Sequence, residues 1–542
     1  MGRNAFAQLI GDWAVSICNP ADRSITLAVD FVGARQLYYS FDNAGLTWCT
    51  ILDPLVLLAE KRFELNEEYL AGLFASFPEA GLTPFVGIHS VQPAHFVHLQ
   101  PGKHLTVEYW QFDPSKRIQY RKDGQYEEHF RAVLGQAVCR RLASDRPVLA
   151  ELSGGMDSSS IVCMADELIA EGMADSPRLD TLSYYNDSEP NWDERPYFTK
   201  VEEKRGRSGL HIDAALPQDA MFEAEAAAFA ATPGALNCRS KARDELADYM
   251  NSQGNRVVLS GIGGDEFLGG VPNPIPELSD LLSRAQARIL ARQLRSWALA
   301  TRKPWLKLLL QSAQPFLPSF MLRNPRERCS APWLSPDFAK RHSRAIGGAN
   351  SRLRLFGPLP SFQDNISTLN HVRKLITSTA LPRDPLYEKR YPYLDRDLLE
   401  FLYAIPPEQL LRPGQRRSLM RRSMVGIVPD EVLNRRRKAY VTRMPMAAVV
   451  AQWSSLYAMS HDMVSIRLGV IDPNVFTKAL VQAHDGINTP MISLMRVFSI
   501  ELWLRHLRCR KVLALPVEMR EPAVDHGTPD LWHSASSKTS AS

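Results

Sequence analysis

The chain has 542 residues, of which 45% are hydrophobic and 23% charged, and its formal net charge is +5. This length allows two or three domains with buried cores, and so small a net charge gives no compositional case for nucleic-acid binding. Seven scattered cysteines without paired metal spacing fit a reducing compartment. Neither a secretory signal nor an apolar run of about 18 residues is present, so we expect a cytoplasmic protein without a transmembrane segment.

Residues 11–110 alternate short apolar segments with polar turns, a pattern typical of β-strands. One or two helices are expected in this part, near residues 53–59 and 67–75. A β-rich first domain is therefore predicted. A helix over residues 124–143, with Phe130 and Leu134 on its apolar face, should link this domain to the rest of the chain.

A short apolar run at residues 147–152 predicts a buried strand. Small and hydroxyl-bearing residues then end the strand and open a helix: Ser153, Gly154, Gly155, Ser158 and Ser159. Either Ser158 or Ser159 is expected to cap that helix. The loop would lie at a helix N-terminus, where free N–H groups and the helix dipole favour phosphate oxygens, and Asp157 offers a hard oxygen to magnesium.

A Gly-Gly turn between a strand and a helix is often only structural. The complete segment SGGMDSS, residues 153–159, is rarer. It resembles the pyrophosphate loop of ATP pyrophosphatases, enzymes that cut ATP between the α and β phosphates and form acyl adenylates. It lacks the Gly-Lys-Ser/Thr of a P-loop. The resemblance implies that this loop binds ATP.

A second apolar run, residues 179–185, ends in a polar segment that contains Asp193 and Glu194. These two acids either cap the next helix or, by the same resemblance, lie near the nucleotide. Strands that alternate with helices predict an α/β domain with a parallel sheet. Ligands of such sheets bind at the carboxyl ends of the strands.

A second glycine-rich motif, VVLSGIGGDEFLGG, occupies residues 257–270. It could be only a flexible loop. However, it matches a stretch that follows the pyrophosphate loop in asparagine synthetase-like enzymes, which implies nucleotide contacts from Ser260, Gly261, Gly263 and Gly264. By that resemblance Asp157 and Asp265 approach one Mg²⁺ from neighbouring strand ends and neutralise phosphate charge as pyrophosphate departs.

Residues 281–330 contain ten Lys or Arg and a single acid, Glu327. Arginines recur every three or four residues beside leucines and tryptophans, which predicts a basic amphipathic helix within an insertion at about residues 275–360. The plain interpretation is a solvated helix face. The alternative is a docking face for an acidic partner peptide or an anionic membrane surface.

Two further segments resemble the asparagine synthetase-like family. Glu388 stands ahead of a Pro-aromatic-Leu-Asp corner, residues 392–395, where the family has a glutamate; this implies a general base with a raised pKa. Lys438 begins Lys-Ala-Tyr where the family has Lys-Gly-Phe, and it would contact the α-phosphate. Each could instead be ordinary surface charge. The all-helical segments around them predict a helical C-terminal lobe.

The β-rich domain also resembles a known one. GDWAV at residue 11, LAVDFVGARQLYY at residue 27 and FVGIHSVQPAHFVHL at residue 85 are similar to the Ntn-type glutaminase domain of asparagine synthetases. That family attacks glutamine with an N-terminal cysteine, whereas this chain begins Met1-Gly2-Arg3, and Cys18 falls inside a predicted strand. We expect residues 1–115 to be a degenerate glutaminase-like domain, residues 116–515 an adenine-nucleotide α-hydrolase-like (PP-loop) synthetase domain, and residues 516–542 a disordered tail.

Relatives that use an amine of their own substrate include lasso peptide macrolactam synthetases and β-lactam synthetases. The basic insertion favours a peptide, and Glu151, where synthetases usually have an apolar residue, is a further departure from asparagine chemistry. The resemblance to lasso cyclases implies adenylation of an Asp or Glu side chain of a precursor peptide, with ATP and Mg²⁺, and attack by the peptide's N-terminal amine. It also implies a leader peptidase and a leader-binding protein as partners.

Three alternatives stay open at this point. A β-lactam-type enzyme would release pyrophosphate with a small amino acid and no peptide. A glutamine-independent asparagine synthetase-like enzyme would use the same nucleotide loops. A non-catalytic scaffold is disfavoured by the intact Asp157, Asp265 and Lys438.

Overall fold

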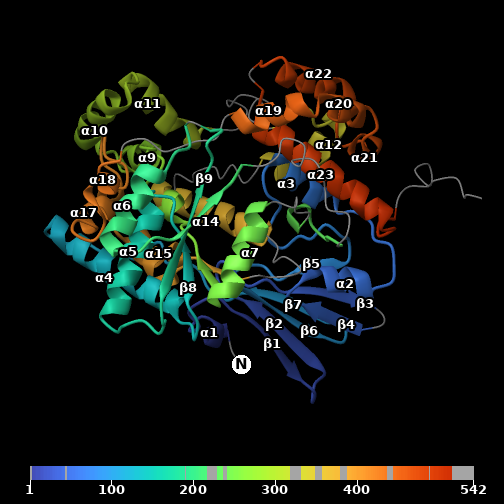
Figure 1. Cartoon of the computed structure of the whole chain (residues 1–542), viewed down its shortest axis with the longest axis horizontal. Coiled ribbons are helices and arrows are strands. Elements are labelled where there is room, and N and C mark those ends of the chain that lie inside the picture. Colours follow the sequence, from blue (N-terminus) through green and yellow to red (C-terminus); the bar gives the residue numbers. More distant parts are fainter. Residues whose placement is uncertain are drawn as a thin grey trace, which may run out of the picture.

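The computed structural model describes residues 3–42, 45–189, 191–215, 229–235, 241–317, 331–347, 357–378, 387–435, 443–487 and 489–514. The tail expected from residue 516 onwards lies outside these ranges. No helix within them combines the length and the apolar composition needed to cross a membrane. Figure 1 shows a β-rich part at the lower right, a central sheet flanked by helices, and two helical lobes above.

The N-terminal part contains two antiparallel sheets that follow a short helix, α1 (Arg3–Phe6). One sheet has the order β1-β2-β6-β7 and the other the order β4-β3-β5. Leu27, Val97 and Tyr39 point into the core between them. The strands are β1 (Ala14–Asn19), β2 (Ser24–Val29), β3 (Tyr38–Asp42), β4 (Gly45–Cys49), β5 (Ile88–Ser90), β6 (His95–Gln100) and β7 (Lys103–Glu108). The predicted β-rich domain is confirmed, and its two expected helices are α2 (Leu52–Leu58) and α3 (Glu67–Ala75).

A parallel sheet of order β10-β9-β8-β11-β12 forms the centre of the second domain, as predicted. Val148, Leu149 and Ala150 of β8 are fully buried, which is why this central strand is a continuous apolar run. The strands are β8 (Val148–Glu151), β9 (Leu179–Tyr185), β10 (Leu210–Asp213), β11 (Val257–Leu259) and β12 (Glu388–Arg390).

Helices cover both faces of this sheet. The linking helix α4 (Asp123–Leu142) buries Phe130, Leu134 and Val138 and packs against α5 (Met156–Ala170). On the other face Leu246 and Met250 contact Leu149 and Val258 of the sheet. Further helices of this domain are α6 (Arg195–Arg205), α7 (Lys241–Gln253), α8 (Gly264–Phe267), α14 (Pro360–Ser378), α15 (Arg396–Ala404), α16 (Pro407–Leu410), α17 (Ser418–Ser423) and α18 (Asp430–Leu433), with single 3-10 turns at η2 (Pro233–Ala235) and η6 (Pro392–Leu394).

The basic insertion divides between two places. Helices α9 (Ile275–Ser283), α10 (Ala287–Thr301) and α11 (Trp305–Ala313), with the turn η3 (Gln314–Phe316), form a small lobe around Leu294, Trp297 and Leu308. Its next helices, α12 (Pro336–Arg341) and α13 (Ser343–Gly347), pack elsewhere, because Trp333 and Phe338 belong to a second core.

That second core joins the two ends of the chain. Leu55, Phe63 and Phe74 of the N-terminal domain pack with Leu456 and Trp503 of the last helices. The backbone confirms the union, since the Phe63 N–H donates to the Val512 carbonyl at 2.8 Å. These last helices are α19 (Arg443–Ala451), α20 (Trp453–His461), α21 (Val464–Arg467), α22 (Pro473–His484) and α23 (Met491–Cys509). The predicted helical C-terminal lobe exists, and it rests on the β-rich domain.

A buried network links the two domains. Arg141 donates to Asp12 at 2.9 Å and to Asp395 at 2.7 Å, and the Asp395 carboxylate is fully buried. Gln36 Nε2 donates to the Thr377 carbonyl at 2.6 Å. Arg35 forms an ion pair with Glu388 on β12. The N-terminal domain therefore contacts the edge strand of the parallel sheet.

Candidate active site

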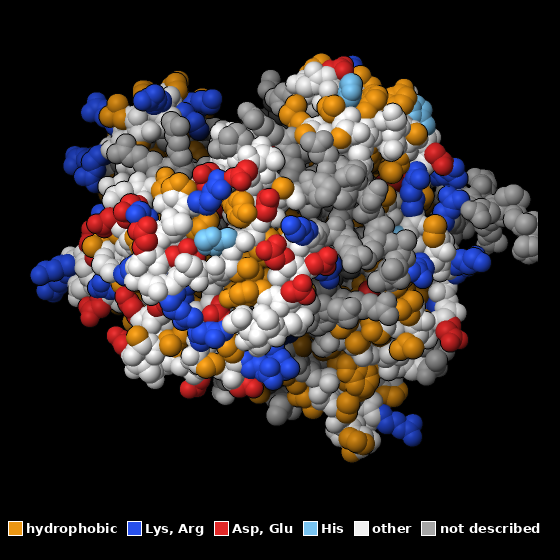
Figure 2. Space-filling view, in the orientation of Figure 1, with side chains coloured by type: hydrophobic (Ala, Val, Ile, Leu, Met, Phe, Trp, Pro, Cys, Tyr) orange, Lys and Arg blue, Asp and Glu red, His pale blue; other side chains and the backbone are white. Residues whose placement is uncertain are grey.

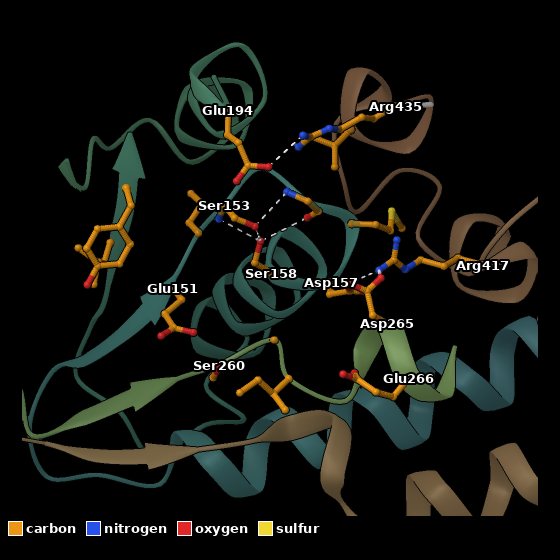
Figure 3. Close-up of a pocket in the computed structure, with 18 of the residues that line it drawn as sticks. Glu151, Ser153, Asp157, Ser158, Glu194, Ser260, Asp265, Glu266, Arg417 and Arg435 are labelled. Atoms are coloured by element: carbon orange, nitrogen blue, oxygen red, sulfur yellow. Dashed lines mark hydrogen bonds and ion pairs between the residues drawn. The ribbon is translucent and has the colours of Figure 1, made fainter. Parts of the chain in front are cut away.

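A cavity of about 440 Å³ opens at the carboxyl ends of β8, β9 and β11, where a parallel sheet is expected to bind its ligand (Figure 3). Both glycine-rich loops reach it. Its lining comprises Glu151, Leu152, Ser153, Gly155, Met156, Asp157, Ser158, Leu182, Tyr184, Trp192, Glu194, Ser260, Gly261, Ile262, Asp265, Glu266, Arg416, Arg417, Arg421, Val432 and Arg435.

The first loop turns sharply from β8 into α5. Gly154 has a φ of +64°, and a Cβ there would lie 2.6 Å from the Cβ of Tyr197, so the loop requires glycine. The N-cap of α5 is Gly155, which provides no side-chain cap, and the first-turn residues Met156 and Asp157 face the cavity. The open N-terminus of this 15-residue helix favours an anion.

The prediction that Ser158 or Ser159 caps α5 is wrong. The helix begins at Met156, because Gly155 already takes the extended backbone conformation of an N-cap. Ser158 instead lies within 3.1 Å of the Ser153 hydroxyl and lines the cavity. Ser159 is fully buried inside α5 and does not line it, although the sequence indicated a nucleotide contact.

The second loop brings Asp265 beside Asp157. Ser260 and Gly261 line the cavity, whereas Gly263 and Gly264 do not. Gly263 has a φ of +99°, and a Cβ on Gly264 would lie 2.5 Å from the Asp157 carboxyl carbon. Gly264 therefore lets the two loops approach each other, whereas Gly263 makes a left-handed turn against Leu394 and Tyr393, where a Cβ would lie 2.8 Å and 2.9 Å from their side chains. Both roles differ from the nucleotide contact that the sequence suggested.

Arg417 joins the two loops. Its Nη2 forms ion pairs with both Asp157 and Asp265, which Figure 3 shows converging on the guanidinium group. The Arg417 side chain is 5% exposed, and its backbone adopts the left-handed conformation with φ 53° and ψ 42°. For a non-glycine residue this conformation costs about 1–3 kcal/mol, so the surrounding contacts must hold it in place.

Two more arginines face the cavity without a carboxylate partner among the described residues, Arg416 and Arg421. Burial, and then the nearby Arg417, lower the pKa of Arg416. Burial, followed by Arg416 and Arg417, lowers the pKa of Arg421. Because an anion would offset this mutual repulsion, the cluster is suited to phosphate oxygens.

A further ion pair closes the opposite side of the cavity. Arg435 donates to Glu194 at 2.9 Å and to the Gly154 carbonyl at 3.1 Å, and its guanidinium lies 4.1 Å from the Tyr197 ring centre. Glu194 is the N-cap of α6 without a side-chain cap bond. Its carboxylate thus holds an arginine beside the first loop. Asp193, the other candidate at this strand end, pairs with Arg195 outside the cavity.

Glu388, the predicted general base, is not a lining residue. It lies at the start of β12, paired with Arg35 and, at 2.6 Å, with Arg390. Its neighbour Lys389 points the other way and binds Glu151, a lining residue, at 2.7 Å. Although burial opposes the charge of Lys389, Glu151 outweighs that effect and raises the pKa of the lysine. Lys438, the other predicted catalytic residue, lies outside the described ranges.

The side chains that line the cavity fit ATP and Mg²⁺. Two carboxylates from neighbouring loops lie within reach of one another, and magnesium is commonly bound by one or two carboxylates together with substrate phosphates. Within the described ranges no group of three or more His, Cys, Asp or Glu could hold a metal ion by itself. Leu152, Leu182, Trp192 and Val432 supply apolar surface for a base on the same cavity.

A second cavity, of about 850 Å³, adjoins the first. Arg416, Arg421 and Arg435 line both. Trp297 and Thr301 of α10 form another part of its wall. The buried Ser418 hydroxyl, also in this wall, has no hydrogen-bond partner among the described residues.

The sequence did not single out the arginines. Arg416, Arg417, Arg421 and Arg435 fall inside the basic segment at residues 412–440, but only Lys438 was assigned a role there. The available signal was the abundance of arginine over lysine in that segment, since arginine is the residue that binds carboxylate and phosphate bidentately.

Comparison with known proteins agrees with this architecture. The asparagine synthase family model matches residues 129–505, and the glutamine amidotransferase domain model matches residues 1–110. Asparagine synthetase [glutamine-hydrolyzing] 3 of Bacillus subtilis (strain 168) is 24% identical over 451 residues, which span 80% of this chain and 67% of the relative. Amidase chry2 of Gibberella zeae is 23% identical over 494 residues, which span 81% and 70% respectively.

Proposed function

Because this chain belongs to the asparagine synthase family, whose members are ATP-dependent amide ligases, we propose that it closes the macrolactam ring of a lasso peptide precursor. A side-chain carboxylate of the peptide attacks the α-phosphate of ATP, and the bond to the β-phosphate breaks, which releases pyrophosphate. The peptide's N-terminal amine then attacks the acyl carbon and loses a proton, an isopeptide bond forms, and AMP leaves.

The observation that carries the adenylation step is the meeting of two acidic loops and an arginine cluster at one helix N-terminus. Asp157 and Asp265 would hold Mg²⁺, which supplies charge neutralisation to the departing pyrophosphate. Arg416 and Arg421 would bind the phosphate oxygens, and the first turn of α5 would donate its free N–H groups.

The second cavity offers an entry side for the carboxylate substrate. At about 850 Å³ it lies near the upper end of the roughly 300–1,000 Å³ typical of small-molecule sites, and it meets the first cavity at three arginines. A carboxylate that enters from this side would meet guanidinium groups before it reaches the nucleotide. Holding amine and adenylate together in such a site can supply about 7–11 kcal/mol of the barrier reduction.

The proton acceptor for the attacking amine needs to lie within hydrogen-bond reach of it. Glu388 stays a prediction for this role, and its pairing with Arg35 and Arg390 outside the cavity weakens it. Glu151 and Glu266 face the cavity and are better placed. A leader peptidase and a leader-binding protein are the partners that this reaction implies.

Mass spectrometry of a precursor peptide with ATP, Mg²⁺ and the leader protease tests the proposal. We expect the core peptide to lose the mass of one water with the native enzyme, and to be only trimmed with the Asp157→Asn variant. If pyrophosphate is released with a free amino acid and no peptide is cyclised, the chain is a small-molecule amide synthetase instead, as its similarity to asparagine synthetases also allows.

A further inference from the structure

The lobe formed by α9, α10 and α11 turns an unusual surface outward. On α10 the buried residues Leu290, Leu294 and Trp297 face the lobe core. By helical periodicity, the opposite face of α10 carries Arg288, Arg292, Arg295 and Leu299. Leu299 is 82% exposed at the C-terminal end of this arginine stripe. A merely solvated helix face does not need that leucine.

The neighbouring helix adds apolar surface. Trp305, Leu306 and Leu310 of α11 are 54%, 52% and 62% exposed. Leu306 and Leu310 lie one turn apart and share a face. With Leu299 they give this lobe four large exposed apolar side chains, more than solubility requires.

The charge on α10 and α11 has a single sign. Residues 281–317 contain seven Lys or Arg and no Asp or Glu. Within the described ranges, no carboxylate lies in ion-pair distance of the three α10 arginines. Figure 2 shows basic and hydrophobic side chains together over this upper-left lobe, while the acidic ones gather below it.

We propose that the outward surface of α10 and α11, which we call the lobe surface (Arg288, Arg292, Arg295, Leu299, Trp305, Leu306 and Leu310), docks onto an anionic membrane. Guanidinium groups meet lipid phosphates, and the leucines and the tryptophan enter the boundary between headgroups and acyl chains. An acidic protein would satisfy the arginines as well, but the exposed apolar side chains beside them favour a lipid interface.

The docking has a structural consequence. Trp297, Ala300 and Thr301 of the same helix line the second cavity. A membrane-bound lobe surface would therefore hold that cavity close to the bilayer. The proposal does not depend on the reaction, because the lobe surface shares no residue with the nucleotide cavity.

Co-sedimentation of the full chain with lipid vesicles tests this proposal. We expect binding to phosphatidylcholine vesicles that contain phosphatidylglycerol, weakened by added salt, and little binding to pure phosphatidylcholine. Leu299→Gln combined with Leu310→Gln should reduce the affinity about tenfold or more, because two apolar side chains that would enter the lipid layer are lost. Arg288→Gln combined with Arg292→Gln should reduce it too, while pyrophosphate release in solution stays unchanged.

The matched control is Leu58→Gln, which replaces a leucine that is 77% exposed on α2, away from the lobe. It should bind vesicles as the native chain does. The proposal is overturned if the native chain does not bind anionic vesicles, or if Leu58→Gln lowers vesicle affinity as much as the lobe variants do. It is also overturned if polyglutamate binds the lobe surface while anionic vesicles do not bind. Equal binding to neutral and anionic vesicles would also contradict it.

Discussion

Arg417 is the residue at which the two acidic loops meet. Its backbone N–H donates to the Gly269 carbonyl at 3.2 Å, and its side chain reaches both carboxylates from a strained left-handed backbone. Such strain persists only where neighbouring contacts enforce it. The site therefore depends on how closely the second loop can approach Asp157.

Gly264→Ala tests this dependence. The new Cβ would lie 2.5 Å from the Asp157 carboxyl carbon, so one of the two loops must move. We expect pyrophosphate release to fall by about tenfold to a hundredfold, in line with the sensitivity of catalysis to small displacements. The matched variant is Gly135→Ala inside α4, outside the cavity, whose Cβ meets its nearest neighbour, Met164 Sδ, at 3.7 Å. A similar loss in both variants would show that close loop approach is not the cause.

At the scale of elements, strands and helices with one buried face were predicted well. The linking helix was expected at residues 124–143 and spans Asp123–Leu142, and the α3 boundaries agree residue for residue. These segments owe their structure to local periodicity, which the sequence displays. The α5 cap was missed because a glycine can serve as N-cap without any side-chain signal.

The site was predictable only in part. The two loops followed from motifs next to strands, and the proximity of Asp157 to Asp265 was expected from the resemblance to asparagine synthetase-like enzymes. Arg417 and Arg435 come from positions about 150 to 280 residues away in the chain, and only tertiary folding brings them to the loops. The motif around Glu388 did not show which side chain faces the cavity: alternation along β12 directs Lys389 rather than Glu388 towards Glu151.

A buried glutamate on helix α9 should make the stability of the folded chain depend on pH. Burial, and then Glu408 and Asp280, raise the pKa of Glu277 from 4.5 to about 7. Between these values the folded state binds more protons than the unfolded state, so the free energy of unfolding should fall as pH rises. The full effect is up to about 3 kcal/mol.

Glu277→Gln should remove this dependence. We expect urea unfolding to show the variant more stable than the native chain at pH 8 and little different below pH 4.5. Glu128→Gln, at an exposed position of α4, is the control and should keep the native dependence. Parallel pH profiles for the native chain and the Glu277 variant would contradict the assignment.

At the scale of the whole molecule, the N-terminal domain shares a core with the last helices. Leu55 and Phe74 pack with Leu456, Phe498 and Trp503, which come from the other end of the chain. The isolated fragment 1–115 would expose this face to water. We expect its amide NMR spectrum to lack the dispersion of a folded domain, and cooperative thermal unfolding of the fragment would contradict the shared-core description.

We propose that the cavity between the two loops adenylates a carboxylate. The most direct measurement supplies a substrate peptide whose ring-forming carboxylate carries ¹⁸O, together with ATP and Mg²⁺, and follows the label by mass spectrometry. Attack of that carboxylate on the α-phosphate predicts one ¹⁸O in the AMP released with the native chain, and none with Asp157→Asn. Recovery of the label in inorganic phosphate, with ADP as the nucleotide product, would contradict the claim.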